Sequence, residues 1–138
     1  MSAPFCLSMV RRATAPTAAW IGRIVHESAP GVVSLSDDPT TQVPLGIVRE
    51  IDVDLEKVSV VVAGEVRVRV GAAGLTAGSS SFIAAAEGAT AAEDGKAGDA
   101  TAGDFYVGRV IDLLGDAGED AVVLAYVAPG QLARAEGT

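Results

Sequence analysis

The fold of this chain is decided by the stretch Leu45-Gly-Ile-Val-Arg-Glu-Ile-Asp-Val-Asp-Leu-Glu-Lys-Val-Ser-Val-Val-Val-Ala-Gly-Glu-Val-Arg-Val-Arg-Val70. Near its end, valines at every second position alternate with Glu65, Arg67 and Arg69. Successive side chains of a strand point to opposite faces, so this alternation predicts a sheet with one buried and one solvated face. A glycine can supply the positive φ of a tight turn, and we therefore expect a hairpin that turns at Ala63-Gly64-Glu65.

Composition agrees with a β-rich core. The chain has 138 residues, enough for one domain with a buried interior. Hydrophobic residues make up 49% of it but aromatic residues only 4%, so valine, isoleucine, leucine and alanine must fill the core. The β-branched share of these residues favours strands.

Outside the central stretch, short apolar runs alternate with glycine-rich and proline-rich turn signals. Trp20-Ile-Gly-Arg-Ile-Val25 is echoed by Tyr106-Val-Gly-Arg-Val-Ile111, which indicates two equivalent strands with Gly22 and Gly108 at barrel corners, unless the likeness is a coincidence. Pro129-Gly130 is expected to end the final strand. About eight such strands predict an all-β domain, either a small β-barrel or a compact β-sandwich, over residues 20–130.

Residues 1–19 are interpreted as an extended N-terminal arm, and residues 131–138 as a polar C-terminal tail. Pro4 and Pro16 discourage a continuous helix in the arm. Apolar side chains that would otherwise be exposed to water indicate a partner site, although a loosely ordered terminus is the alternative. We expect removal of the arm to leave the barrel folded. The candidate contact residues are Phe5, Leu7, Met9, Val10, Arg11 and Arg12 in the arm, with Arg67 and Arg69 in the central stretch.

Charge and cysteine content exclude several classes of partner. The formal net charge of −8 disfavours nucleic acid and anionic membranes, because phosphate contacts need concentrated lysine and arginine. No apolar run approaches the roughly 18 residues of a membrane-spanning helix. Cys6 is the only cysteine, so the chain has no intrachain disulfide and no cysteine pair for zinc.

The sequence predicts no catalytic, cofactor or metal site. Asp37-Asp38-Pro39 is more typical of a solvated turn than of acid/base chemistry, and His26 is the only histidine. Biotin and lipoyl carriers also present a lysine in a hairpin, but the residues around Lys96 do not match the context that such carriers use. We therefore expect a protein that is not an enzyme.

The order of several short sequence motifs along residues 20–127 resembles that in the capsid cement, or decoration, proteins of tailed bacteriophages. Each motif is common in β proteins, but the order and the spacing of the motifs together are more specific than any single motif. The motifs are Leu45-Gly-Ile-Val, Val60-Val-Val-Ala-Gly-Glu-Val-Arg-Val, Ala72-Ala-Gly-Leu-Thr-Ala-Gly78, Glu93-Asp-Gly-Lys-Ala97, Val107-Gly-Arg-Val-Ile-Asp112 and Ala121-Val-Val-Leu. The chain departs from the family in a longer, more apolar arm and in an expanded alanine-rich segment at 84–103.

The resemblance implies a small β-barrel without catalytic or cofactor residues that binds the outer surface of a phage capsid. Its partners would be the major capsid protein and further copies of itself, as a homotrimer at local three-fold positions. It would be in the host cytoplasm before assembly and on the virion afterwards. The alternative is a ligand-binding or carbohydrate-binding β-module displayed on a virion or fibre.

Overall fold

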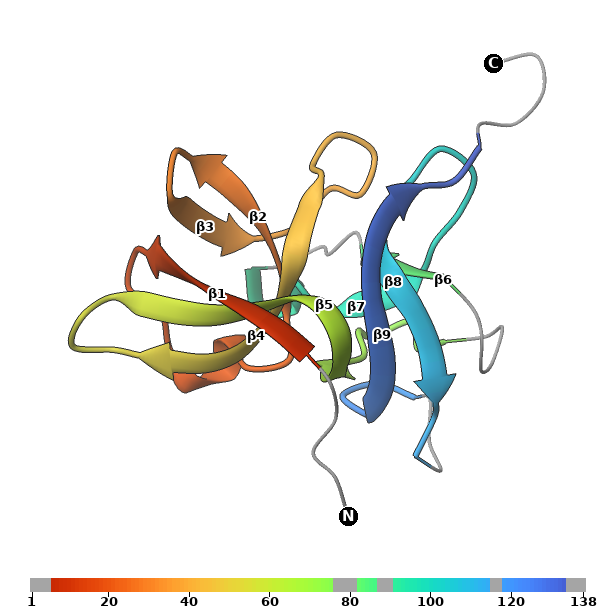
Figure 1. Ribbon diagram of the computed structural model, residues 1–138. Helices are drawn as coiled ribbons and strands as arrows, with labels where there is room; N and C mark the ends of the chain where they lie inside the picture. The colour runs from red at the N-terminus through yellow and green to blue at the C-terminus, as the bar shows by residue number, and fades with distance from the viewer. Residues whose placement is uncertain (1–5, 76–81, 87–90, 115–117, 134–138) are drawn as a thin grey trace.

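The structure, a computed structural model, describes residues 6–75, 82–86, 91–114 and 118–133, and it confirms the all-β class (Figure 1). Two short 3-10 helices, η1 (Ala18–Trp20) and η2 (Ala91–Glu93), accompany the strands. The described strands are β1 (Cys6–Ala13), β2 (Ile24–Ala29), β3 (Val32–Leu35), β4 (Pro44–Asp52), β5 (Lys57–Arg69), β6 (Phe82–Ala85), β7 (Ala97–Asp99), β8 (Phe105–Asp112) and β9 (Val122–Gln131).

Five strands close a β-barrel, which we call the first ring. Neighbouring strands pair in the order β1-β3-β2-β4-β5, and β5 pairs again with β1. The pairing of β1 with β3 is parallel, whereas the other four pairings are antiparallel. Closure satisfies most strand edges within the molecule, which is how barrels avoid unpaired backbone groups.

The C-terminal half of β5 begins a second ring. It pairs with β9, and the order continues through β8 and β6 to β7. A single parallel bridge between Val70 and Ala97 then returns the chain to the end of β5. Figure 1 shows β5 passing from the group formed by β1 to β4 toward the group that contains β6, β8 and β9.

The two rings repeat the same pattern of strand pairs, residue by residue. In both, a hairpin is followed by a second hairpin, and the first and third strands of the ring are parallel. One irregularity also matches, because β4 carries an extra residue between Val48 and Glu50, and β8 carries one between Val110 and Asp112. Equivalent pairs are Ala13↔Val33 and Val70↔Ala97, Val25↔Gly46 and Ile83↔Gly108, and Ile47↔Val61 and Arg109↔Tyr126.

This repeat corrects the expected equivalence of residues 20–25 and 106–111. The equivalent of Gly108 is Gly46 in β4, not Gly22. A Cβ atom at either Gly46 or Gly108 would overlap a carbonyl oxygen of the next strand, that of Val61 or Tyr126 respectively. Gly22 instead lies before β2, where its amide donates to Val48 O and its carbonyl accepts from Arg69 N.

The expected turn at Ala63-Gly64-Glu65 is also wrong, because β5 runs through it without interruption. The hairpin turns earlier, after β4, where Glu56 has a φ of +50°. Gly64 does use its positive φ of +99°, but as a bend inside the strand. At this bend β5 leaves its last pairing with β1 and begins its ladder with β9.

Two clusters of buried side chains fill the rings. The first ring encloses Ala13, Val25, Val33, Val48, Val58 and Val60. The second encloses the equivalent residues Val70, Ile83, Ala97, Val110, Val123 and Ala125, and its cluster also includes Ile24, Ile47 and Val61 from the first ring. Val60 and Val61 are adjacent in β5 and belong to different clusters, so both faces of the strand are buried there.

The N-terminal segment differs from the expected arm. Residues 6–13 form β1, which pairs with β5 along most of its length, and Ala13 is buried in the first ring. Main-chain pairing explains why so few apolar anchors suffice to order this segment. The polar tail also begins later than expected, because β9 continues through Pro129-Gly130 to Gln131.

We therefore predict that the first ring depends on β1. Truncation of residues 2–13 removes two of the five pairings of the ring and should lower the melting temperature by more than about 10 °C or abolish cooperative unfolding. Truncation of residues 2–5 leaves the described ladders intact and is the matched control. Circular dichroism melts measure both variants, and an unchanged melting temperature for the longer truncation would restore the interpretation of an arm.

Candidate functional site

Exposed aromatic and arginine side chains form a row across the outer side of the second ring. Phe82 of β6 pairs with Arg109 of β8, which pairs in turn with Tyr126 of β9. Phe82 is 40% exposed and Tyr126 42% exposed, and Arg109 is exposed as well. We call Phe82, Tyr106, Arg109 and Tyr126 the aromatic–arginine face.

Tyr106 extends this face along β8. Its ring centroid lies 4.4 Å from that of Phe82, with the two ring planes tilted by 40°. The Tyr106 ring also lies against Gly130, where a Cβ atom would overlap it. Contact with a neighbouring ring and with backbone fixes the side chain, so little rotamer entropy remains to be lost when a partner binds.

The repeated strand pairs of the two rings identify the first-ring residues that are equivalent to this face. The first-ring equivalents of Phe82, Arg109 and Tyr126 are Ile24, Ile47 and Val61. Those three aliphatic side chains are fully buried, because the second ring packs against them. The aromatic–arginine face therefore occupies the position that, in the first ring, is an internal interface.

A groove of about 540 Å³ lies beside this face. Its apolar wall is formed by Ile21, Val66 and Leu124, whereas Arg49 and Arg67 supply positive charge. Arg49 Nη1 lies 3.4 Å from Cys6 Sγ. The groove is lined by Cys6, Ile21, Val48, Arg49, Glu65, Val66, Arg67 and Leu124.

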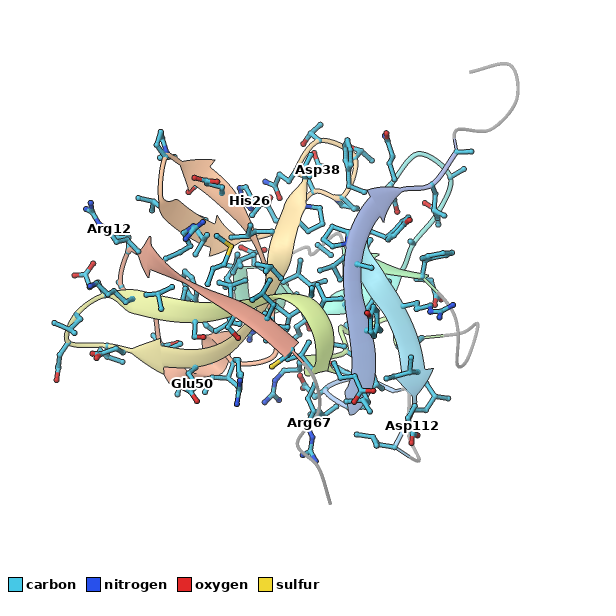
Figure 2. All side chains as sticks on the ribbon, in the orientation of Figure 1. Arg12, His26, Asp38, Glu50, Arg67 and Asp112 are labelled. Atoms are coloured by element: carbon cyan, nitrogen blue, oxygen red, sulfur yellow. The ribbon has the colours of Figure 1, made fainter. Side chains whose placement is uncertain are left out.

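The structure does not gather the sequence-predicted contact residues at one site. Leu7 and Val10 are exposed on β1, Met9 and Arg11 are half-buried, and Phe5 lies outside the described residues. Figure 2 shows Arg12 and Arg67 well apart on the molecule.

Of the predicted residues that the structure describes, only Arg67 lines the groove. Arg69 lies two residues further along β5, where its partner in the ladder is Val122.

The sequence alone did not predict the aromatic–arginine face. None of the aromatic residues in the described part of the chain is among the buried core residues. The period-two alternation of residues 122–127 could have placed Tyr126 outward, on the side opposite Val123 and Val127. Its pairing with Arg109 and Phe82 depends on register across three strands, which the sequence alone does not specify.

Buried charges connect segments of the second ring, and Arg23 attaches that ring to the first. Lys96 precedes β7, and its side chain is only 8% exposed. Its Nζ atom lies 2.6 Å from Asp120 Oδ1 and 3.2 Å from Glu93 Oε2. Arg23 of the first ring donates from Nη1 to the carbonyl oxygens of Ala92 and Asp94, both at 2.9 Å. A lysine held in this way is not presented to a modifying enzyme.

These contacts shift the pKa values of the groups involved. The hydrogen bond from Lys96 lowers the pKa of Asp120, and the same bond raises the pKa of Lys96. Burial, and then the charge of Arg69, lower the pKa of the Arg23 guanidinium. Burial also raises the pKa of Asp94.

The remaining titratable groups singled out from the sequence have structural explanations. Asp38 accepts hydrogen bonds from Thr40 N, Thr40 Oγ1 and Thr41 Oγ1, which lower its pKa and fix the turn. Burial lowers the pKa of His26, whose Nδ1 lies 3.4 Å from Ser36 Oγ. Within the described ranges, no group of three or more His, Cys, Asp or Glu side chains is placed to hold a metal ion.

Comparison with protein-family models and with curated proteins finds no match to this chain. Among the residues that the structure describes, there is also no helix of the length and apolar character needed to cross a membrane.

We predict that the Lys96 ion pairs stabilise the second ring. Lys96→Met leaves Glu93 and Asp120 without their cation and should lower the free energy of unfolding by about 2 kcal/mol, at the low end for such pairs because Asp120 is half exposed. Lys57→Met, at an exposed lysine, is the control and should change it by less than about 0.5 kcal/mol. Urea denaturation measures both, and equal values would contradict the prediction.

The effect of Lys96→Met should depend on pH. Because the folded pKa of Asp120 lies below its ordinary value of 3.8, its contribution is complete above that pH and is lost as the pH falls through the folded value. The pKa of Lys96 lies above its ordinary 10.5, so its contribution is lost only as the pH rises through that higher value. The stability difference between wild type and variant should be flat between these limits and shrink at both ends.

Proposed function

We propose that this protein is a structural, non-enzymatic protein of a tailed-phage virion that binds the outer surface of the capsid and joins neighbouring major capsid subunits. The observation that carries the proposal is the aromatic–arginine face, which provides a contact surface on the second ring. The resemblance of its sequence motifs to those of phage capsid cement proteins indicates that the partner is a capsid protein.

The chemistry of the face suits a protein partner. Tyrosine and arginine are enriched among the residues that contribute most to protein interfaces, especially where they are surrounded by apolar contacts. Tyr126 and Arg109 are paired across two strands, with Phe82 on the next strand. A face held on three paired strands changes little on binding, which favours a stable contact.

Other features fit a protein that is present in many copies. A net charge of −8 keeps free copies soluble in the host cytoplasm before they attach to the capsid. Attachment at positions where capsid subunits meet would be reinforced if copies also contact one another, as in a homotrimer, because linked contacts act at high effective concentration.

The same exposed rings favour one alternative, a carbohydrate-binding module displayed on a virion or fibre. Sugar sites stack rings against exposed aromatic side chains, and Phe82 and Tyr126 are both accessible. Phe82, however, is partly covered by Tyr106 at 4.4 Å, which leaves less of its ring free for stacking. Binding of the isolated protein to a glycan array would favour this alternative.

We predict that the aromatic–arginine face attaches the protein to capsids. Tyr126→Ala and Arg109→Ala should each weaken co-sedimentation with undecorated heads by at least about tenfold, since each removes a central contact. Val43→Ala changes an exposed apolar residue outside the face and is the control. Wild-type affinity in both face variants, with their melting temperatures unchanged, would show that another surface makes the contact.

A further inference from the structure

The hairpin between β4 and β5 ends in an exposed tip that is both acidic and apolar. Val53 is 58% exposed and Leu55 63% exposed. Asp52 Oδ1 accepts a hydrogen bond from Leu55 N at 3.0 Å, which fixes the turn. Exposed carboxylates surround the two apolar side chains, at Glu50, Asp52, Asp54 and Glu56.

The groove beside the aromatic–arginine face has the complementary character. Ile21, Val66 and Leu124 give it an apolar wall. Arg49 and Arg67 outnumber its one acidic residue, Glu65, so the groove is locally positive on a protein of net charge −8. Its volume of about 540 Å³ is in the range of sites that enclose small ligands or groups of side chains.

The tip cannot fill the groove of its own molecule. Arg49 lies on β4, and Val53 follows the end of the same strand. At about 3.3 Å per residue, an extended strand carries Val53 about 13 Å away from Arg49. Figure 1 shows the turn between β4 and β5 at the left of the view, away from β9, the strand that carries Leu124 of the groove. An occupant with the chemistry of the tip must therefore come from another copy.

We propose that copies of this chain associate head to tail, with the hairpin tip of residues 52–56 of one copy bound in the groove of the next. Val53 and Leu55 would contact the apolar wall, while Asp54 and Glu56 would face Arg49 and Arg67. Because the tip and the groove are different surfaces, the contact is heterologous and closes into a ring when the rotation between copies permits. The inference rests on the proposed function, which includes self-association, and it identifies the two surfaces through which copies contact one another.

The first test measures the association of the isolated full chain by sedimentation velocity over a range of concentrations. Leu55→Asp at the tip and Arg67→Glu in the groove should each raise the dissociation constant by at least about tenfold. Val43→Asp places the same charge at an apolar residue of similar exposure, 59%, and should leave association unchanged. High salt should weaken association of the wild type, because the contact pairs opposite charges.

A charge exchange separates the proposed contact from general effects on folding. Asp54→Arg alone should weaken association as Arg67→Glu does. The two changes combined in one chain restore an opposite-charge pair at every junction, so the dissociation constant should return to within about threefold of the wild-type value. A double variant weaker than either single variant would overturn the proposal.

A mixing experiment tests whether the contact is head to tail. Leu55→Asp disables the tip and Leu124→Asp disables the groove, so each variant alone should remain monomeric. In a mixture, the intact tip of one variant meets the intact groove of the other, and dimers should form that grow no further. A mixture that stays monomeric, with both variants folded by circular dichroism, would contradict a heterologous contact.

Two further outcomes would overturn the proposal. One is a wild-type chain that stays monomeric at every concentration measured. The other is association that requires residues 2–5 and is unaffected by Leu55→Asp, since the N-terminus of another copy, and not its hairpin tip, would then make the contact. Capsid binding by the monomeric Leu55→Asp variant is measured separately, so loss of self-association is distinguished from failure of the proposed function.

Discussion

The strand β5 is the element on which the rest of the structure depends, because both rings use it. Its N-terminal half closes the first ring against β1, and its C-terminal half begins the second ring against β9. Val60 and Val61 are buried in different clusters on opposite faces of the strand. The bend at Gly64 lets one continuous strand serve both rings without a loop between them.

The shared strand also explains why the two rings carry different types of residue at positions where their strand pairs are equivalent. Ile24, Ile47 and Val61 are aliphatic because the second ring packs on them. In the described part of the chain no further ring covers the equivalent positions of the second ring, and these positions carry Phe82, Arg109 and Tyr126. In repeat architectures an outermost unit needs a surface suited to water or to a partner. Aromatic and arginine side chains suit a partner that binds reversibly.

Local patterning predicted the central and C-terminal strands, whereas β1, which was expected to be part of an arm, and the pairing of distant segments lay beyond it. The alternation around Val66 and Val68 identified β5, and the β-branched composition identified the fold class. The positive φ at Gly64 was expected correctly, but the sequence does not distinguish a bend from a turn. The ordering of β1 depends on hydrogen bonds to residues 57–64, about 50 positions away, and burial of Lys96 depends on Asp120. Both depend on contacts between residues far apart in the sequence, which hydrophobic periodicity and composition do not encode.

Native-state hydrogen exchange tests most directly whether the shared strand makes the two rings one cooperative unit. Amides in the ladder between β1 and β5 report on the first ring, and amides in the ladder between β8 and β9 report on the second. If the rings unfold together, the slowest amides of both ladders should give the same free energy of opening, equal to that of global unfolding. A second ring that opens at a distinctly lower free energy, while the first stays protected, would contradict the account.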